Sequence, residues 1–309
     1  MRAIEYGLAD SKDYVWVGLD REKAKDERRT FAGTLACYSS LRGAGWAWGR
    51  RSEELPPPLP RKHFFLCSVI RLALFLAQNA AASKALGFTA TSSNMSLDGL
   101  FDLARLPHPP SQLNHCLVGL VYGWAAWTGV EIASAGTTVL YYVVTAALRT
   151  IMPVSMRPDP FDHRLYPPQM IPPYRASSVR AFWSQHWHSL IRRSVVFLGT
   201  APTLRLFGRN TLGYLCATMA AFLISGLVHD FQMTIAVDGH LRTYSGLDNF
   251  RNTVWFCSQG LAICAEQVFT AVTGRKVRGA AGWLWTALWF SISSGYVARL
   301  WLDRGVVQL

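Results

Sequence analysis

The sequence predicts an all-α protein: a multi-pass helical membrane protein built around a catalytic chamber. Half of its 309 residues are hydrophobic and only 16% are charged, whereas soluble domains carry roughly 25% charged residues. His229, Asp230 and Glu266 lie inside long apolar runs. Ionisable side chains are costly at membrane depth, and those that persist usually face a protein-lined cavity. Their presence predicts chemistry inside the membrane domain.

Six apolar runs approach the roughly 20 residues that a spanning helix requires. They are 63–82, 113–131, 132–151, 211–231, 252–272 and 281–302. The first run is interrupted by Arg71, and the second and third could separate anywhere around Glu131 to Gly136. Arg71 and Glu131 are most simply helix-end or interhelical partners. We therefore expect five or six spans.

The net charge of +12 does not indicate nucleic-acid binding, because the basic residues lie in connecting loops and not on a soluble domain. The loop 149–193 carries seven arginines against two aspartates, and Arg275, Lys276 and Arg278 fill the loop 273–280. Short basic loops mark the cytoplasmic face of a membrane protein. We expect both loops on that face.

For both loops to share one face, the apolar stretch 194–210 must not cross the membrane. Pro202 and Arg205 interrupt it, and broken backbone at membrane depth is tolerated where it lines a cavity. The sequence therefore predicts a re-entrant or interfacial segment here.

Residues 1–62 form a polar segment that ends in a proline-rich stretch, and 63–309 form the membrane domain. The amino terminus has no positive region followed by an apolar core, so we expect insertion through an internal helix rather than a signal peptide. The six cysteines form no CxxC pair. They are interpreted as small hydrophobic residues rather than disulfides or zinc ligands.

Three short motifs occur in order along the chain: R-G-x-G-W, F-W-x-x-x-W-H and S-G-x-x-H followed by an acid. Their residues are Arg42, Gly43, Gly45 and Trp46; Phe182, Trp183, Trp187 and His188; and Ser225, Gly226, His229 and Asp230. In this order and spacing the chain resembles the wax-synthase-like branch of the membrane-bound O-acyltransferases, fungal type. The resemblance runs from about residue 40 to the carboxyl end. Relatives usually carry further membrane helices before the first motif, where this chain has the polar segment.

The resemblance implies transfer of an acyl group from acyl-CoA to a hydroxyl of a lipophilic alcohol acceptor. Within that branch we favour acetyl-CoA as co-substrate and a terpenoid or other secondary metabolite as acceptor. The alternative is a wax-ester or sterol-ester synthase that uses long-chain acyl-CoA. No cofactor beyond the co-substrate and no metal are expected, and the expected location is the endoplasmic reticulum membrane.

A thioester is already activated, so the reaction needs a base for the alcohol proton and donors for the developing oxyanion. His229 is the candidate base, because imidazole titrates near neutrality. Ser225 and Gly226 precede it by four and three residues on the same helical face, and their small side chains are expected to leave room for substrate. Asp230 or Glu266 could orient the imidazole, and the sequence leaves open which does.

By the resemblance, His188 is the second active-site residue and positions the acceptor or donates to the thioester carbonyl. Trp183 and Trp187 would form an aromatic pocket wall. Anchoring of both side chains at the membrane interface is an equally supported interpretation. Three arginines could meet the CoA phosphates, since guanidinium suits phosphate geometry, or could serve topology alone: Arg180, Arg192 and Arg193. His186 and His188 lack further ligands at suitable spacing for a metal.

Two other classes remain open on the residues alone. A transporter could use the buried imidazole and carboxylates as a proton relay, but the inverted repeats typical of that class are not found in the sequence. A family member without catalytic activity is the second alternative. The soluble acyltransferase pattern H-x-x-x-D is absent at every histidine.

Overall fold

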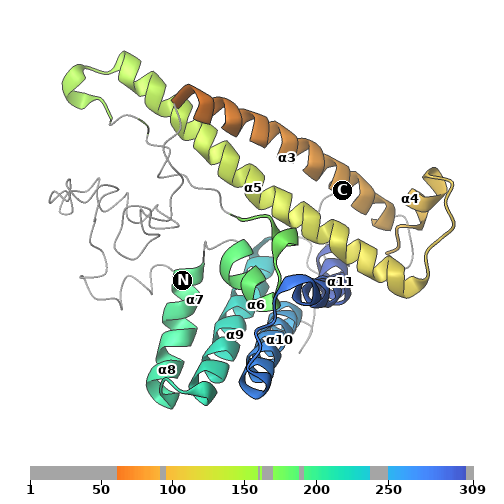
Figure 1. Cartoon of the computed structure of the whole chain (residues 1–309). Coiled ribbons are helices and arrows are strands. Elements are labelled where there is room, and N and C mark those ends of the chain that lie inside the picture. Colours follow the sequence, from red (N-terminus) through yellow and green to blue (C-terminus); the bar gives the residue numbers. More distant parts are fainter. Residues whose placement is uncertain are drawn as a thin grey trace. The chain divides into compact units, whose positions relative to one another are not determined.

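The computed structural model describes residues 61–90, 95–158, 161, 170–187, 191–236 and 250–303, and this part of the chain is helical without strands (Figure 1). The long helices are α3 (Arg61–Ala90), α5 (Ser111–Ile151), α9 (Thr211–Ala236), α10 (Arg251–Thr273) and α11 (Gly279–Asp303). The short helical segments are α4 (Asp98–Leu103), η5 (Val154–Met156), η7 (Pro173–Arg175), α6 (Val179–Ala181), η8 (Phe182–His186), α7 (Arg192–Val195), η9 (Val196–Thr200) and α8 (Ala201–Phe207).

Three of the described helices are long and apolar enough to cross a membrane by length and composition: Lys62–Thr89, Ser111–Ile151 and Thr211–Met233. Large apolar side chains on these helices are exposed, for example Leu74 and Leu140. A surface of this kind suits the lipid tails, which replace water as its surroundings. The predicted all-α membrane class is confirmed.

Helices α10 and α11 occupy the predicted spans 252–272 and 281–302 but are not among those three. Helix α10 buries a polar stripe along its length, and this stripe lowers its mean hydropathy below that of α9. The buried polar residues of α10 are Asn252, Thr253, Gln259 and Glu266. These side chains hydrogen-bond to neighbouring helices, as described below.

Helix α5 is one continuous helix of 41 residues, so the predicted division into 113–131 and 132–151 is wrong. A helix of this length extends roughly 60 Å at 1.5 Å per residue. Proline stops α-helices, and the sequence has Pro110 before α5 and Pro153 after it but none in between. Gly136 lies inside the helix without breaking it.

The chain divides into two compact units, and the boundary between them falls within α3 and within α5. The first unit contains residues 1–76 and 130–169, and the second contains 77–129 and 170–309. The predicted boundary between residues 62 and 63 stays a prediction, because nearly all of the polar segment, including the R-G-x-G-W motif, lies outside the described residues.

In the first unit, the amino-terminal half of α3 packs on the carboxyl-terminal half of α5. Arg71 pairs with Glu131, whose side chain is almost completely buried. Phe65 stacks on Tyr142 with ring centroids 4.5 Å apart. Removing Arg71 would leave the buried charge of Glu131 uncompensated, so the pair favours this register of the two helices.

In the second unit, the first half of α5 packs closely on α11. A Cβ built on Gly119 would press against the backbone of Ser294 and Gly295, so the two helices approach with almost no side chain between them. Leu97, Val118 and Ala298 form a small core beside this crossing. Small residues permit this kind of close approach between membrane helices.

Residues 192–207 form an unbroken helical stretch of α7, η9 and α8 that packs against α9 (Figure 1). Within the predicted segment 194–210, Pro202 and Arg205 do not interrupt the helical backbone, which continues to Phe207. Pro202 lies in the first turn of α8, directly after the π-helical turn η9, where a missing backbone N–H costs little. A Cβ at Gly199 would touch the backbone of Ala220, so this stretch lies tightly on α9. Its re-entrant placement in a membrane stays a prediction.

Candidate functional site

His229 lies on α9, half-buried, with its ring orientation set by its own helix. Its Nδ1 is 2.7 Å from the backbone carbonyl oxygen of Ser225, one turn earlier. A carbonyl can only accept, so Nδ1 carries the proton and donates it. The neutral ring then has an unprotonated Nε2, which makes no hydrogen bond within the described part of the chain. This tautomer is the one that can take a proton from a substrate.

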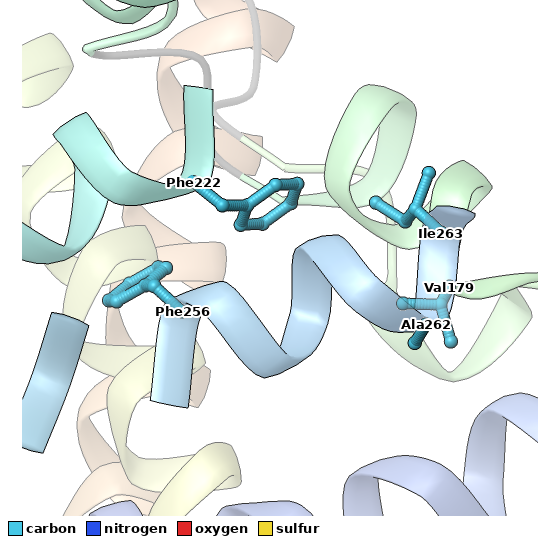
Figure 2. Packing of buried hydrophobic residues seen from close by; sticks show 5 residues of the cluster. All are labelled: Val179, Phe222, Phe256, Ala262 and Ile263. Carbon is cyan, nitrogen blue, oxygen red and sulfur yellow. The ribbon is translucent and has the colours of Figure 1, made fainter. Parts of the chain in front are cut away.

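Aromatic rings surround His229 and connect it to the segment that carries Trp183. The imidazole lies against Phe256 of α10 with ring centroids 4.4 Å apart. Trp183 contacts the same Phe256 ring at 5.6 Å and Phe222 of α9 at 5.5 Å. Figure 2 shows Phe222 and Phe256 between α9 and α10. The predicted catalytic histidine and the predicted aromatic wall therefore share a ring neighbour.

Asp230, the next residue on α9, is buried and caps the start of α10. Its carboxylate accepts hydrogen bonds from the backbone N–H groups of Asn252 (3.1 Å) and Thr253 (2.9 Å). The side chains of the same two residues donate as well, at 2.9 Å and 2.6 Å. A carboxylate at this position satisfies helix-end donors and opposes the positive end of the helix dipole. Asp230 thus holds α10 against α9.

Glu266 on α10 makes the corresponding connection to the segment before His188. Its buried carboxylate accepts from the backbone N–H groups of Val179 (2.7 Å) and Arg180 (3.1 Å) and from the indole N–H of Trp285 on α11 (2.9 Å). Val179 also packs against Ala262 and Ile263 of α10 (Figure 2). One carboxylate therefore joins the start of α6 to two long helices.

Neither carboxylate hydrogen-bonds His229 within the described residues, although Asp230 and Glu266 were the expected orienting acids. The expected room for substrate beside Gly226 is also not there. A Cβ on Gly226 would overlap the Cα of Thr253. This glycine lets α9 and α10 come together, and Ser225 contributes its carbonyl to the imidazole.

The segment 178–187 begins at Ser178, whose side chain accepts from the N–H of Ala181 at 2.9 Å. It continues as the π-helical turn η8, a form that often marks functional sites. In this turn Trp183 and Trp187 meet with ring centroids 5.9 Å apart, so the predicted aromatic pair does form. His186 is buried and donates from Nδ1 to the carbonyl of Pro172 at 2.9 Å, which anchors the end of the turn.

His188 lies outside the described residues, and so does the side chain of Arg193. Arg192 is exposed and its guanidinium donates to the carbonyl of Ser184 at 3.3 Å. Arg180 is exposed too, with its backbone N–H on Glu266. Their predicted role toward CoA phosphates stays a prediction.

Several residues of the site carried no signal in the sequence. Phe222 and Phe256 are ordinary members of apolar runs, and only the packing of α9 on α10 brings them to His229 and Trp183. Asn252 and Thr253 could have been suspected as polar residues at the start of an apolar run. Their partner Asp230 is more than twenty positions away along the chain, and the sequence does not specify that pairing.

The comparisons with known proteins concern the sequence of this region. Residues 166–245 match the membrane bound O-acyl transferase family, and this stretch contains both η8 and His229. The chain is 23% identical over 267 residues to the O-mevalon transferase macI of Penicillium terrestre, an alignment that covers 81% of this chain and 56% of that protein. The chain thus spans about half the length of the curated relative it matches. No solved structure matches the chain.

Proposed function

We propose that the chain, whose residues 166–245 match the membrane bound O-acyl transferase family, transfers an acyl group from acyl-CoA to a hydroxyl of a lipophilic acceptor. One observation carries the proposal. His229 holds its proton on Nδ1 through Ser225 and keeps Nε2 as an acceptor next to an aromatic wall. A general base of this kind is what attack by an alcohol on a thioester needs.

In the proposed reaction, Nε2 of His229 takes the hydroxyl proton while the acceptor oxygen attacks the thioester carbonyl carbon. A carbon–oxygen bond forms, and the carbonyl electron pair moves onto its oxygen. The tetrahedral intermediate then collapses: the carbonyl re-forms, the carbon–sulfur bond breaks, and the CoA thiolate takes the proton back from the imidazolium. The imidazole ends neutral, so one histidine serves as base and then as acid.

The remaining expected residues extend this proposal. His188 would position the acceptor or donate to the carbonyl, as the motif implies. Trp183 and Trp187, in ring contact with each other, would bound the space for acyl group or acceptor. Arg180 and Arg192 are exposed on the same segment, and guanidinium groups there suit the CoA phosphates.

For the finer specificity we favour an acetyl group and a terpenoid or other secondary-metabolite acceptor over long-chain wax or sterol esters. The Penicillium terrestre relative is named an O-mevalon transferase. That name supports transfer involving oxygen and mentions no long-chain acyl group. The donor panel should therefore include acetyl-CoA, a mevalonyl thioester of CoA and a long-chain acyl-CoA.

The test uses membranes from cells that express the full chain, incubated with each labelled acyl-CoA and a panel of alcohols, and compares wild type with His229→Ala. The proposal expects a labelled ester from the wild type and none above background from the variant. Equal product from both would contradict it. A wild type that makes no ester with any donor while it moves protons or solutes across vesicles would favour the transporter class.

A further inference from the structure

Trp183 carries a buried hydrogen-bond donor for which the described residues provide no acceptor. Its indole Nε1 is sealed from solvent, and it has no hydrogen-bond partner in the part of the chain that the structure describes. A buried donor without an acceptor costs free energy, and such groups in native proteins call for an explanation.

Five other indoles of the same unit have an acceptor in the structure. Trp255 donates to the carbonyl of Ser293 at 2.9 Å, and Trp289 donates to the side-chain oxygen of Gln259 at 2.8 Å. Trp283, Trp285 and Trp301 donate at 2.8–2.9 Å to Tyr174, Glu266 and Asn252. Trp183 differs from these five because its indole N–H has no acceptor among the described residues.

The surroundings of Trp183 are aromatic and firmly held. Its ring lies 5.2–6.2 Å from the rings of its neighbours, which offer only π faces and edges to the N–H: Phe182, Trp187, Phe222, Trp255, Phe256 and Phe290. N–H to π contacts are weak compared with a hydrogen bond to oxygen. The start of its segment is fixed by Glu266. The indole is therefore preorganised, and it still needs an acceptor.

A molecule that binds next to His229 would supply this acceptor, because Trp183 and His229 both contact the ring of Phe256. We propose that the Trp183 indole N–H donates to the carbonyl oxygen of the acyl thioester and stabilises the negative charge that develops on it. This inference rests on the proposed function. A fixed donor in a water-poor aromatic site stabilises an oxyanion more than the same donor in water.

The matched pair for the test is Trp183 and Trp255, whose rings lie 6.0 Å apart in the same cluster. Trp183 is replaced by 3-benzothienylalanine, which keeps the two-ring shape and substitutes sulfur for the N–H, and by phenylalanine as the encoded variant. Trp255→Phe is the control, because it removes a satisfied structural bond to Ser293. Each variant is measured for kcat and KM with the best acyl-CoA and for its thermal midpoint in detergent.

We expect the benzothienyl replacement at position 183 to lower kcat by about 10²-fold, the typical effect of losing one oxyanion donor. Its KM for acyl-CoA and its thermal midpoint should stay near wild type. Trp255→Phe should show the opposite pattern, with a lower midpoint and a kcat near wild type. Wild-type kcat in the benzothienyl protein would overturn the inference.

A binding measurement keeps the inference testable if the position-183 variants turn over too slowly to assay. The probes are a ketone analogue of acyl-CoA, in which CH2 replaces the thioester sulfur, and its counterpart without the carbonyl. Wild type should bind the ketone more tightly, and the benzothienyl protein should bind both equally. An unchanged preference for the ketone would overturn the inference. Failure of the proposed function looks different: wild type itself would form no ester with any donor.

Discussion

The imidazole of His229 donates its Nδ1 proton to the backbone carbonyl of Ser225 at 2.7 Å, one turn earlier on the same helix. A carbonyl orients the ring and sets its tautomer without placing a full negative charge beside it. The two buried carboxylates nearby serve as helix caps instead. Asp230 fixes α10 to α9, and Glu266 fixes the Trp183 segment to α10. Ser225 therefore orients the imidazole, whereas Asp230 and Glu266 hold the helices and the segment that carries Trp183.

Glu266→Gln should destabilise the protein and also lower turnover. A glutamine can accept with one oxygen only, and its NH2 would face a backbone N–H now bonded to the carboxylate. Leaving a buried donor unsatisfied costs about 1–3 kcal/mol. Turnover should fall because the segment carrying Trp183 loses its anchor. Thermal unfolding in detergent and ester formation measure the two effects.

The control for that substitution is Gln267→Ala at the neighbouring position, which removes only a 3.3 Å contact to Thr218. It should change both quantities little. If Glu266→Gln matched this control in midpoint and turnover, the anchoring role of the carboxylate would be refuted.

Gly226→Ala should separate α9 from α10, because its new methyl group would occupy the place of the Thr253 backbone. Overpacking of this kind costs roughly 1–3 kcal/mol or more when backbone must move. Gly123→Ala on α5 is the matched control, since nothing lies within 4 Å of its added Cβ. In a helix interior that change should be neutral or stabilising by about 0.5–1 kcal/mol. Equal thermal midpoints for the two variants would contradict the close approach of α9 and α10.

Arg175→Cys and Lys276→Cys should react with an impermeant thiol reagent from the same side of the membrane. Both native side chains are exposed, and their segments lie side by side, since the indole N–H of Trp283 donates to the carbonyl of Tyr174 at 2.8 Å. The basic loops predict the cytoplasmic side. The background is a chain without its native cysteines, labelled in intact and in permeabilised cells. Labelling of the two positions from opposite sides would refute the shared face.

His188→Asn should keep a measurable rate, while His188→Ala should not. The prediction follows from the expected positioning role of His188, because an asparagine amide can still donate and accept at similar reach. Both variants are compared on one acceptor, and acyl-CoA binding is measured separately, since a lost binding contact raises KM and a lost transition-state contact lowers kcat. Equal inactivation by the two changes would indicate that the imidazole of His188 titrates during turnover.

The helical class and the positions of most helices could be predicted from the apolar runs, but the extent of α5 could not be. Hydropathy continues through Glu131 and Gly136, and either residue could have ended a helix. The structure shows that the helix continues through both residues. The charge of Glu131 is balanced by Arg71 on α3. That pairing joins residues 60 positions apart, so a local pattern does not contain it.

For the candidate site, the sequence predicted His229 because an ionisable side chain in an apolar run is costly, and it predicted Trp183 because it belongs to a motif; both signals are local, and both assignments stay predictions. It did not identify what the acids do. Asp230 and Glu266 bind backbone N–H groups, and these are present in every residue and carry no sequence signal. Which N–H groups reach a given carboxylate is decided by helix packing. Helix packing also decides the close approach of α10 to Gly226, so the sequence pattern does not reveal it.

The central claim is that Nε2 of His229 accepts the proton of the attacking hydroxyl, and His229→Asn tests it most directly. The asparagine amide can still donate toward the Ser225 carbonyl, so the helix keeps its contact, but no nitrogen remains that can take a proton. The measurement is kcat for ester formation with the preferred acyl-CoA, on protein whose thermal midpoint and membrane insertion match wild type. The account predicts a fall of about 10²- to 10⁴-fold. Turnover near the wild-type rate in such protein would contradict it.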